Sequence, residues 1–192
     1  MVSDVRAALA ALVYAAYNER DGYVFYSRIA EHIRDEKGRR MFAGLAGDEV
    51  RHYQLLAAEY ESLRTGGSWL PVAVAMATEV PSISEFRADI CDISGAGVPS
   101  EKLFPNPEAV IPALDAGIGD LQAIDMALEA EKRGYDIYSS AEQQASDANA
   151  KAAYRFLMQE ENKHYEWLQK SRSYLANSQT YWDETELPFF EG

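Results

Sequence analysis

The sequence predicts an all-α fold, an antiparallel four-helix bundle made of two repeated helical hairpins joined by a long crossover. The first observation is that the chain repeats itself: ERDGYVFYS at 19–27 returns as EKRGYDIYS at 131–139, an offset of 112 residues. The second is that each copy lies in a long stretch of helical periodicity with good helix formers and breakers at its ends. Self-similarity of this kind indicates a duplicated structural unit.

A second pair of segments has the same spacing. DEVRHYQLL at 48–56 and EENKHYEWL at 160–168 are also 112 residues apart. The repeated unit therefore contains two helices, and its copies run from about 3 to 65 and from about 115 to 177. Together with a crossover of about 66–119, they are expected to form one domain over residues 1–177.

Four helices are expected in these units, with approximate bounds 4–33, 36–64, 120–145 and 147–175. Ser3 is placed to cap the first helix and Ser146 or Asp147 to cap the fourth, because short side-chain oxygens accept bonds from the first backbone N–H groups. Gly66 and Gly67 are expected to end the second helix.

The connections decide the topology. The turns at 34–35 and 146–147 are short, so each pair of helices, roughly 40 Å long, forms an antiparallel hairpin. Segment 66–119 holds most of the prolines and is too long for an ordinary loop, so short helices such as 84–90 are expected in it. One long crossover between two hairpins is the ferritin-like topology. The tail 178–192 is aromatic and acidic, and is expected to pack on the bundle or on a partner chain.

Composition excludes several classes of function. A net charge of −13 argues against nucleic acid and anionic membrane surfaces as partners, since both require basic patches. The single cysteine, Cys91, excludes a disulfide framework, a thiolate zinc site and a rubredoxin-type iron centre, and fits a reducing, cytoplasmic location. The apolar run AALAALVYAAY begins the repeated helix, so cleaving it as a signal peptide would remove half of the symmetry. No apolar run reaches the ~18 residues of a membrane span.

The repeat also places a set of metal-binding residue types on all four helices. Residues three apart share a helix face, so each Glu-x-x-His motif can hold one metal ion. The first helix of each hairpin adds one glutamate at the same repeat position. This is the pattern of the di-iron and di-manganese carboxylate sites of helix bundles. The expected metal ligands are Glu19, Glu49, His52, Glu131, Glu161 and His164.

Charge supports a metal at this position. Four carboxylates inside a bundle repel one another unless they are protonated or neutralised, and two divalent cations would neutralise them. Ligation rich in carboxylate with one imidazole per metal favours iron or manganese over zinc, so two iron ions per chain are expected, with manganese as the alternative. A single Glu-x-x-His would be interpreted as a solvated surface pair, but two at one repeat offset favour a metal site. The third histidine, His32, is interpreted as a surface residue.

Two tyrosines are the candidate catalytic residues outside the ligand set. Tyr26 and Tyr138 lie seven residues beyond the first glutamate of each repeat, two turns further along the same helix face, and Tyr23 and Tyr135 lie one turn along it. A tyrosine at this position can hydrogen-bond a ligand carboxylate or serve as a nearby oxidisable group. Aromatic residues at helical spacing are more often part of the core, and this alternative stays open.

Two glycines stand out because glycine is unusual in a helix interior. Gly22 and Gly134 occupy the same repeat position and indicate a close approach of helices, across the pseudo-twofold axis. Cys91 is expected to be a small buried hydrophobic residue.

The motifs ERDGYVFY, DEVRH, EKRGYDIY and EENKH resemble those of the rubrerythrin branch of the ferritin-like superfamily. The resemblance covers about 1–65 and 115–177, and the tail more loosely. It implies a four-helix bundle with a di-iron centre, commonly dimeric, sometimes with helices exchanged between subunits. Many members reduce hydrogen peroxide with electrons from a rubredoxin-like module. It also implies terminal ligands at Glu19, Glu131, His52 and His164 and bridging carboxylates at Glu49 and Glu161.

The sequence departs from this family pattern in two respects. No cysteine-rich rubredoxin domain is present, so electrons are expected from a separate donor such as a rubredoxin-like protein. The well-studied peroxidase members carry an additional glutamate one turn before the third-helix ligand, where this chain has Leu128. The neighbouring Glu129 is expected to point to another face. A more symmetric six-ligand site follows.

The leading hypothesis is a homodimeric oxidoreductase that reduces hydrogen peroxide or dioxygen, because two metals can each supply one electron to an O–O bond. Iron storage with ferroxidase activity is the main alternative, but it requires a cage, and the irregular tail argues against one. A manganese catalase-like site is a third possibility. A metal-free structural bundle is disfavoured by the repulsion within the site.

Overall fold

The structure is a computed structural model that describes residues 2–86, 102–178 and 180–182. Within these residues the chain is helical and has no strand. The predicted all-α class is therefore confirmed, and the helix bounds differ from those expected by at most three residues. The four long helices are α1 (Val2–His32), α2 (Glu36–Arg64), α6 (Asp120–Gln144) and α7 (Ala148–Ser178).

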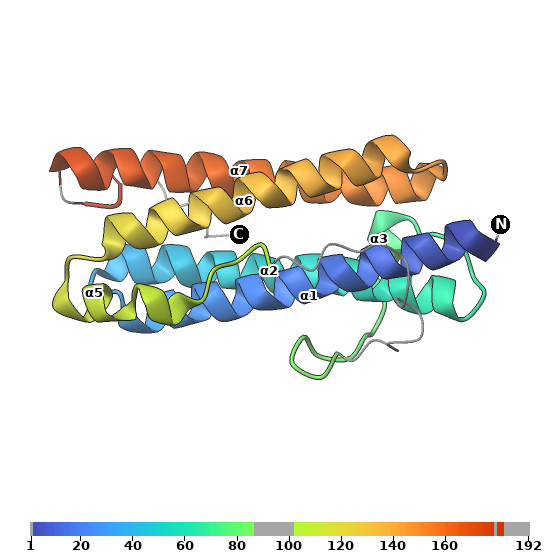
Figure 1. The fold of residues 1–192 in the computed structure, drawn as a ribbon, viewed down its shortest axis with the longest axis horizontal. Helices are drawn as coiled ribbons and strands as arrows, with labels where there is room; N and C mark the ends of the chain where they lie inside the picture. The colour runs from blue at the N-terminus through green and yellow to red at the C-terminus, as the bar shows by residue number, and fades with distance from the viewer. Residues whose placement is uncertain (1, 87–101, 179, 183–192) are drawn as a thin grey trace.

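The long helices form two hairpins that pack against each other along the length of the molecule. Helices α1 and α2 lie side by side in the lower half of Figure 1, and α6 and α7 in the upper half. The predicted ferritin-like bundle of two hairpins is confirmed. Among the described residues, no helix is both long and apolar enough to cross a membrane.

Local sequence explains where the helices begin and end. The Asp35 side chain accepts bonds from two backbone N–H groups in the first turn of α2, at 2.8 and 3.1 Å. Asp147 does the same for α7, at 2.7 and 3.1 Å, as expected of an N-cap residue. The cap predicted at Ser3 is wrong, because α1 already begins at Val2. Gly66, with a φ of 83°, adopts the left-handed conformation that lets the chain turn away after α2.

In its described residues, 66–86 and 102–119, the crossover contains three short helical segments. Near the N-terminal end of the bundle, α3 (Val72–Ala77) packs on α2 and α7, and α5 (Ile111–Ala116) packs on α1 at the opposite end. The 3₁₀ helix η1 (Pro107–Ala109) precedes α5. The short helix predicted at 84–90 is wrong where the chain is described, because residues 83–85 form a turn. The remainder of that segment and Cys91 lie outside the described residues.

The beginning of the tail packs on the bundle. Tyr181 is buried, and its hydroxyl donates to Asp120 at 2.9 Å. Lys37 donates to the backbone carbonyl of Trp182 at 2.8 Å and lies over its ring. Residues 183–192 lie outside the described part of the chain, so contact of the tail with a partner stays a prediction.

Two apolar clusters fill the bundle, one toward each end. One includes Leu12, Leu56 and Leu157, and the other includes Ile29 and Ile124. Burial of apolar surface at about 25 cal/mol per Å² is what holds the two hairpins together. The polar residues of the predicted site lie between these clusters, where the surrounding core excludes water.

Candidate metal centre

The structure brings all six predicted ligands together in the middle of the bundle. Helices α1 and α6 each contribute one glutamate, and α2 and α7 each contribute a glutamate and a histidine from the same face. All six side chains are buried, and none is more than 4% exposed. The residues are Glu19, Glu49, His52, Glu131, Glu161 and His164.

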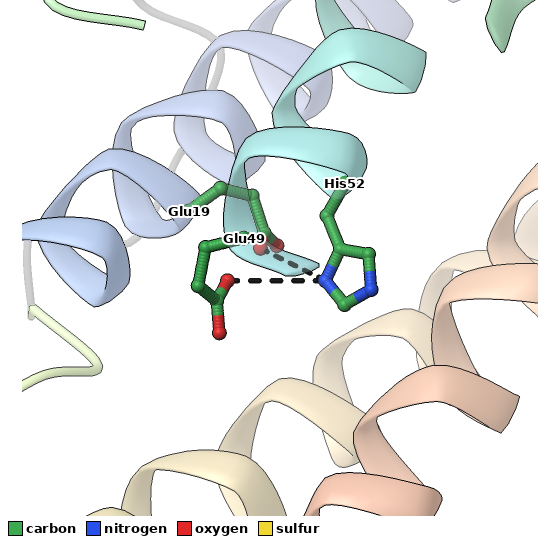
Figure 2. A group of neighbouring side chains, drawn as sticks. All are labelled: Glu19, Glu49 and His52. Carbon is green, nitrogen blue, oxygen red and sulfur yellow. Dashed lines mark hydrogen bonds and ion pairs between the residues drawn. The ribbon is translucent and has the colours of Figure 1, made fainter. Parts of the chain in front are cut away.

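One half of the centre is arranged around His52 (Figure 2). Its Nδ1 atom lies 3.2 Å from Glu19 Oε2 and 3.8 Å from Glu49 Oε2. The same nitrogen is 3.4 Å from Glu161 Oε1, which comes from α7 of the other hairpin. Carboxylates from both hairpins therefore converge on this imidazole nitrogen.

The other half is arranged around His164. Its Nδ1 atom lies 3.4 Å from Glu131 Oε2, and its ring stacks on that of His52 with the centroids 5.4 Å apart. One ligand atom from each of Glu49, Glu131 and His164 lies within 4.8 Å of the others, and so do ligand atoms of Glu19, Glu49 and His52. Glu49 belongs to both groups, as a carboxylate that bridges two metal ions would.

The side chains fit a pair of metal ions. Within the described residues, several buried atoms that face the centre have no hydrogen-bond partner: both carboxylate oxygens of Glu49, Oε2 of Glu131 and Nδ1 of His164. An unsatisfied buried polar group costs about 1–3 kcal/mol, so a cluster of them indicates a missing partner. Carboxylate oxygens with one imidazole nitrogen per ion are suited to iron or manganese.

Comparison with known proteins agrees with this geometry. A family model described as Rubrerythrin matches residues 10–171, which include both hairpins and all six ligands. The chain belongs to the rubrerythrin family. No curated protein and no solved structure matches the chain significantly. The family and the buried Glu/His cluster together support a metal-binding carboxylate protein.

The electrostatics of this rubrerythrin-family centre divide the glutamates into two kinds. Burial, together with the charge of Glu19, raises the pKa of Glu49 well above its usual range. Burial and the charge of Glu131 do the same for the pKa of Glu161. In the metal-free chain the environment therefore favours the protonated form of these two carboxyl groups.

The other two glutamates are held ionised. Burial opposes ionisation of Glu131, but the charge of His164 and hydrogen bonds from Glu161 and Tyr26 lower its pKa to about 2. Burial disfavours a charge on His164 as well, yet Glu131 and Asp48 raise its pKa to about 10. A proton on His164 thus supplies part of the positive charge that metal ions would supply, and metal binding must displace it.

Two tyrosines bind ligands across the hairpin interface. The Tyr26 hydroxyl on α1 donates to Glu131 on α6, and the Tyr138 hydroxyl on α6 donates to Glu19 on α1. Both tyrosines are buried, whereas Tyr135 is 37% exposed. The hydrogen bonds foreseen for Tyr26 and Tyr138 are present, and a catalytic role for these two residues stays a prediction.

The two interior glycines make room for ligands. A Cβ on Gly134 would lie 3.1 Å from Glu161 Oε2, and one on Gly22 would lie 3.0 Å from Glu49 Cδ and 2.8 Å from the Phe104 ring. The sequence predicted a close approach of helices at these glycines, but the atoms nearest to them belong to side chains of neighbouring elements. Each glycine leaves space for the glutamate expected to bridge the metals.

Sequence reasoning missed Asp48. Its carboxylate lies 3.1 Å from Nε2 of His164, the nitrogen that points away from the centre, so it orients that ring. The available signal was that an acidic residue directly precedes the Glu-x-x-His motif in both repeats.

Other predictions about nearby residues hold. Glu129 is exposed and pairs with Arg133 at 3.2 Å, and Leu128 packs against an apolar cluster. Neither supplies a seventh ligand. His32 is half-buried, 2.7 Å from Asp115 near the end of α1, and takes no part in the centre.

Proposed function

We propose that this chain is a dinuclear iron oxidoreductase, with manganese as the alternative metal, that reduces hydrogen peroxide or dioxygen. The observation that carries the proposal is the set of six buried ligands from four helices, in which Glu49 reaches both halves. Two bound Fe(II) ions would supply the two electrons that cleavage of a peroxide O–O bond requires. Family membership supports the same assignment.

The protein would contribute orientation and protons. Hydroxyls of Tyr26 and Tyr138 hold Glu131 and Glu19 in place and keep a transferable proton one hydrogen bond from each carboxylate. Asp48 fixes the ring of His164 so that Nδ1 faces the centre. The apolar clusters at both ends restrict access of water to the reacting oxygen atoms.

Electrons are proposed to come from a separate donor protein. The sequence contains a single cysteine, whereas a rubredoxin-type iron requires four thiolates. Each turnover consumes two electrons. A donor that carries one electron would therefore dock on the surface twice to return the centre to its reduced state. A homodimer in the cytoplasm remains the proposed setting.

The deciding experiment is stopped-flow absorbance after anaerobic loading with Fe(II). The rate of ferric-centre formation with hydrogen peroxide is compared with the rate with dioxygen. Faster oxidation by peroxide supports the peroxidase. Faster oxidation by dioxygen indicates an oxidase or the ferroxidase of an iron-storage protein.

Manganese-loaded protein provides the second arm of this experiment. Oxygen release from peroxide in the absence of any reductant would indicate a catalase and contradict the proposal. The Glu129→Gln variant serves as the control, because this exposed residue lies next to the centre in sequence but outside it in space.

A further inference from the structure

A line of aromatic rings leads from the candidate metal centre to the surface. Tyr138, whose hydroxyl donates to Glu19, stacks on Tyr154 with ring centroids 6.4 Å apart. Tyr154 meets Trp69 edge to face at 5.6 Å. Trp69 is partly exposed, whereas both tyrosines are buried. Three side chains that can each lose one electron are therefore in contact, from a ligand carboxylate outward.

The other hairpin has the same geometry without the same chemistry. Tyr26 is the repeat equivalent of Tyr138, and the residue equivalent to Tyr154 is Phe42. The Tyr26 ring lies 6.0 Å from Phe42, and 5.4 Å from both Phe25 and Phe104. Phenylalanine is far harder to oxidise than tyrosine or tryptophan. Stepwise electron transfer from Tyr26 through these neighbours is therefore blocked. At the position that decides this, Phe42 in one hairpin and Tyr154 in the other, the two halves differ by one hydroxyl group.

We propose that Trp69, Tyr154 and Tyr138 form a relay that carries oxidising equivalents from the metal centre to the surface. The relay rests on the proposed function for its source of oxidation. It acts when the donor protein fails to supply an electron. A small thiol in solution then supplies that electron through the relay, and the ligand side chains are not oxidised.

Each step of the relay moves one electron inward. Hydrogen peroxide that meets a centre short of one electron would take the missing electron from Tyr138, whose phenolic proton passes to Glu19. A neutral phenoxyl radical is left on Tyr138. Tyr154 then reduces Tyr138, which takes its proton back from Glu19. Trp69 reduces Tyr154 in turn and releases its indole proton to water. A thiol returns one electron and one proton to Trp69, and two such turnovers leave one disulfide.

A buried carboxylate can hold the proton of Tyr154 during this transfer. Glu59 is fully buried, and its Oε1 atom has no hydrogen-bond partner among the described residues. Burial of Tyr154 is the main cause that raises the pKa of its phenol, and the charge of Glu59 raises this pKa further. When Glu59 is ionised, its Oε1 atom is therefore available to accept that proton.

The test uses the metal-free full-length chain, so it does not depend on the proposed function. A ruthenium photosensitiser is attached at Ser68→Cys, beside Trp69, in a Cys91→Ser background, and a flash with an electron acceptor generates a one-electron oxidant there. Transient absorption then follows tryptophan and tyrosine radicals. The expected result is a tryptophan radical that decays as a tyrosyl radical forms.

Variants locate the route. Tyr154→Phe keeps the ring contacts, so the relay predicts loss of the tyrosyl radical and a longer-lived tryptophan radical. Tyr26→Phe removes the equivalent hydroxyl from the closed side and should leave both signals unchanged. An undiminished tyrosyl yield in Tyr154→Phe, or equal losses in both variants, overturns the relay.

A second measurement separates this proposal from the function itself. Iron-loaded protein is treated with peroxide without reductant, and oxidised residues are mapped by mass spectrometry. Oxidation at Trp69 that disappears in Tyr154→Phe, with Trp167 and Trp182 as internal references, supports the relay. Oxidation of ligand residues with Trp69 spared contradicts it, and absence of any oxidation contradicts the proposed function while the photochemical result stands.

Discussion

The α1–α2 hairpin and the α6–α7 hairpin supply the same side chains to the centre, two glutamates, one histidine and one tyrosine each, at positions 112 residues apart. Their surroundings differ. Tyr26 is enclosed by phenylalanines, one of them Phe104 from the crossover, and Tyr138 stacks on Tyr154. A pair of metal ions requires similar ligands from both halves, but it places no such demand on the packing behind them, so each half can acquire a separate role.

The histidines show the same divergence. Asp48 binds the outer nitrogen of His164, whereas the outer nitrogen of His52 has no hydrogen-bond partner in the part of the chain that the structure describes. Glu160 holds the position equivalent to Asp48, but it pairs with Lys163 and lies 3.7 Å from Arg51. The two halves of the centre are therefore expected to bind metal with unequal strength.

The largest expected effect comes from removing a ligand. Glu161→Ala should reduce bound metal from about two ions per chain, and Glu49→Ala should remove nearly all of it, because Glu49 lies within reach of both halves. Metal content after anaerobic loading and desalting, measured by mass spectrometry, checks this. Glu129→Ala is the control and should keep its metal. Unchanged stoichiometry in Glu161→Ala would show that the ligand assignment is wrong.

The next effect tests the unequal histidines. Asp48→Asn removes the charged partner of His164 and should weaken one of the two sites by about 10–100-fold, the usual cost of losing such a partner. Glu160→Gln should change neither site measurably, because Glu160 contacts surface cations. Competitive titration with a metal-binding dye resolves the two affinities. Equal weakening of both sites in Asp48→Asn would contradict the asymmetry.

The glycines offer a test in which stability is separated from metal binding. Gly22→Ala should destabilise the metal-free fold by about 1–3 kcal/mol, because its Cβ would lie 2.8 Å from the Phe104 ring. Gly134→Ala should cost less, since the carboxylate 3.1 Å away can turn, and should act mainly on metal affinity. Denaturant midpoints and metal titrations measure the two effects. Gly47→Ala, with nothing within 4 Å, is the control and should stabilise the helix by up to about 1 kcal/mol.

The internal repeat accounts for the features that the sequence could predict, namely the helices and their ligand-bearing faces. The offset from Glu19 to Glu131 and from His52 to His164 identifies the four helices and the face of each that carries ligands, because helical spacing determines which residues share a face. It does not determine which residues of a neighbouring helix meet that face. That Tyr26 reaches Glu131 depends on how α1 and α6 pack against each other.

Contacts that involve the crossover were even harder to predict from the sequence. Phe104 fills the space beside Gly22, yet it belongs to a segment whose path is set by packing and prolines rather than by a repeating pattern. The cap expected at Ser3 failed for a different reason. Helix ends fray and are short of distinctive contacts, so a shift of one or two residues there is common.

The smallest expected effect concerns Glu59, which also distinguishes the two hairpins, because its repeat equivalent is the buried Ser171. Glu59 accepts a hydrogen bond from the backbone N–H of Leu70 at 2.8 Å, but burial raises its pKa to about 7. The folded state thus holds a proton there that the unfolded chain loses near pH 4.5. Stability from this group is complete below pH 4.5 and declines as pH rises through 7.

Glu59→Gln keeps an acceptor for Leu70 and abolishes the titration. Relative to this variant, the wild-type chain should lose on the order of 2 kcal/mol of unfolding free energy between pH 4.5 and pH 8, measured in the metal-free state by urea titration. Ser171→Ala, the matching change in the other hairpin, should follow the wild-type pH dependence. Parallel curves for wild type and Glu59→Gln would mean that Glu59 is ionised in the fold. The hairpins would then differ at this position in charge, but not in how their stability responds to pH.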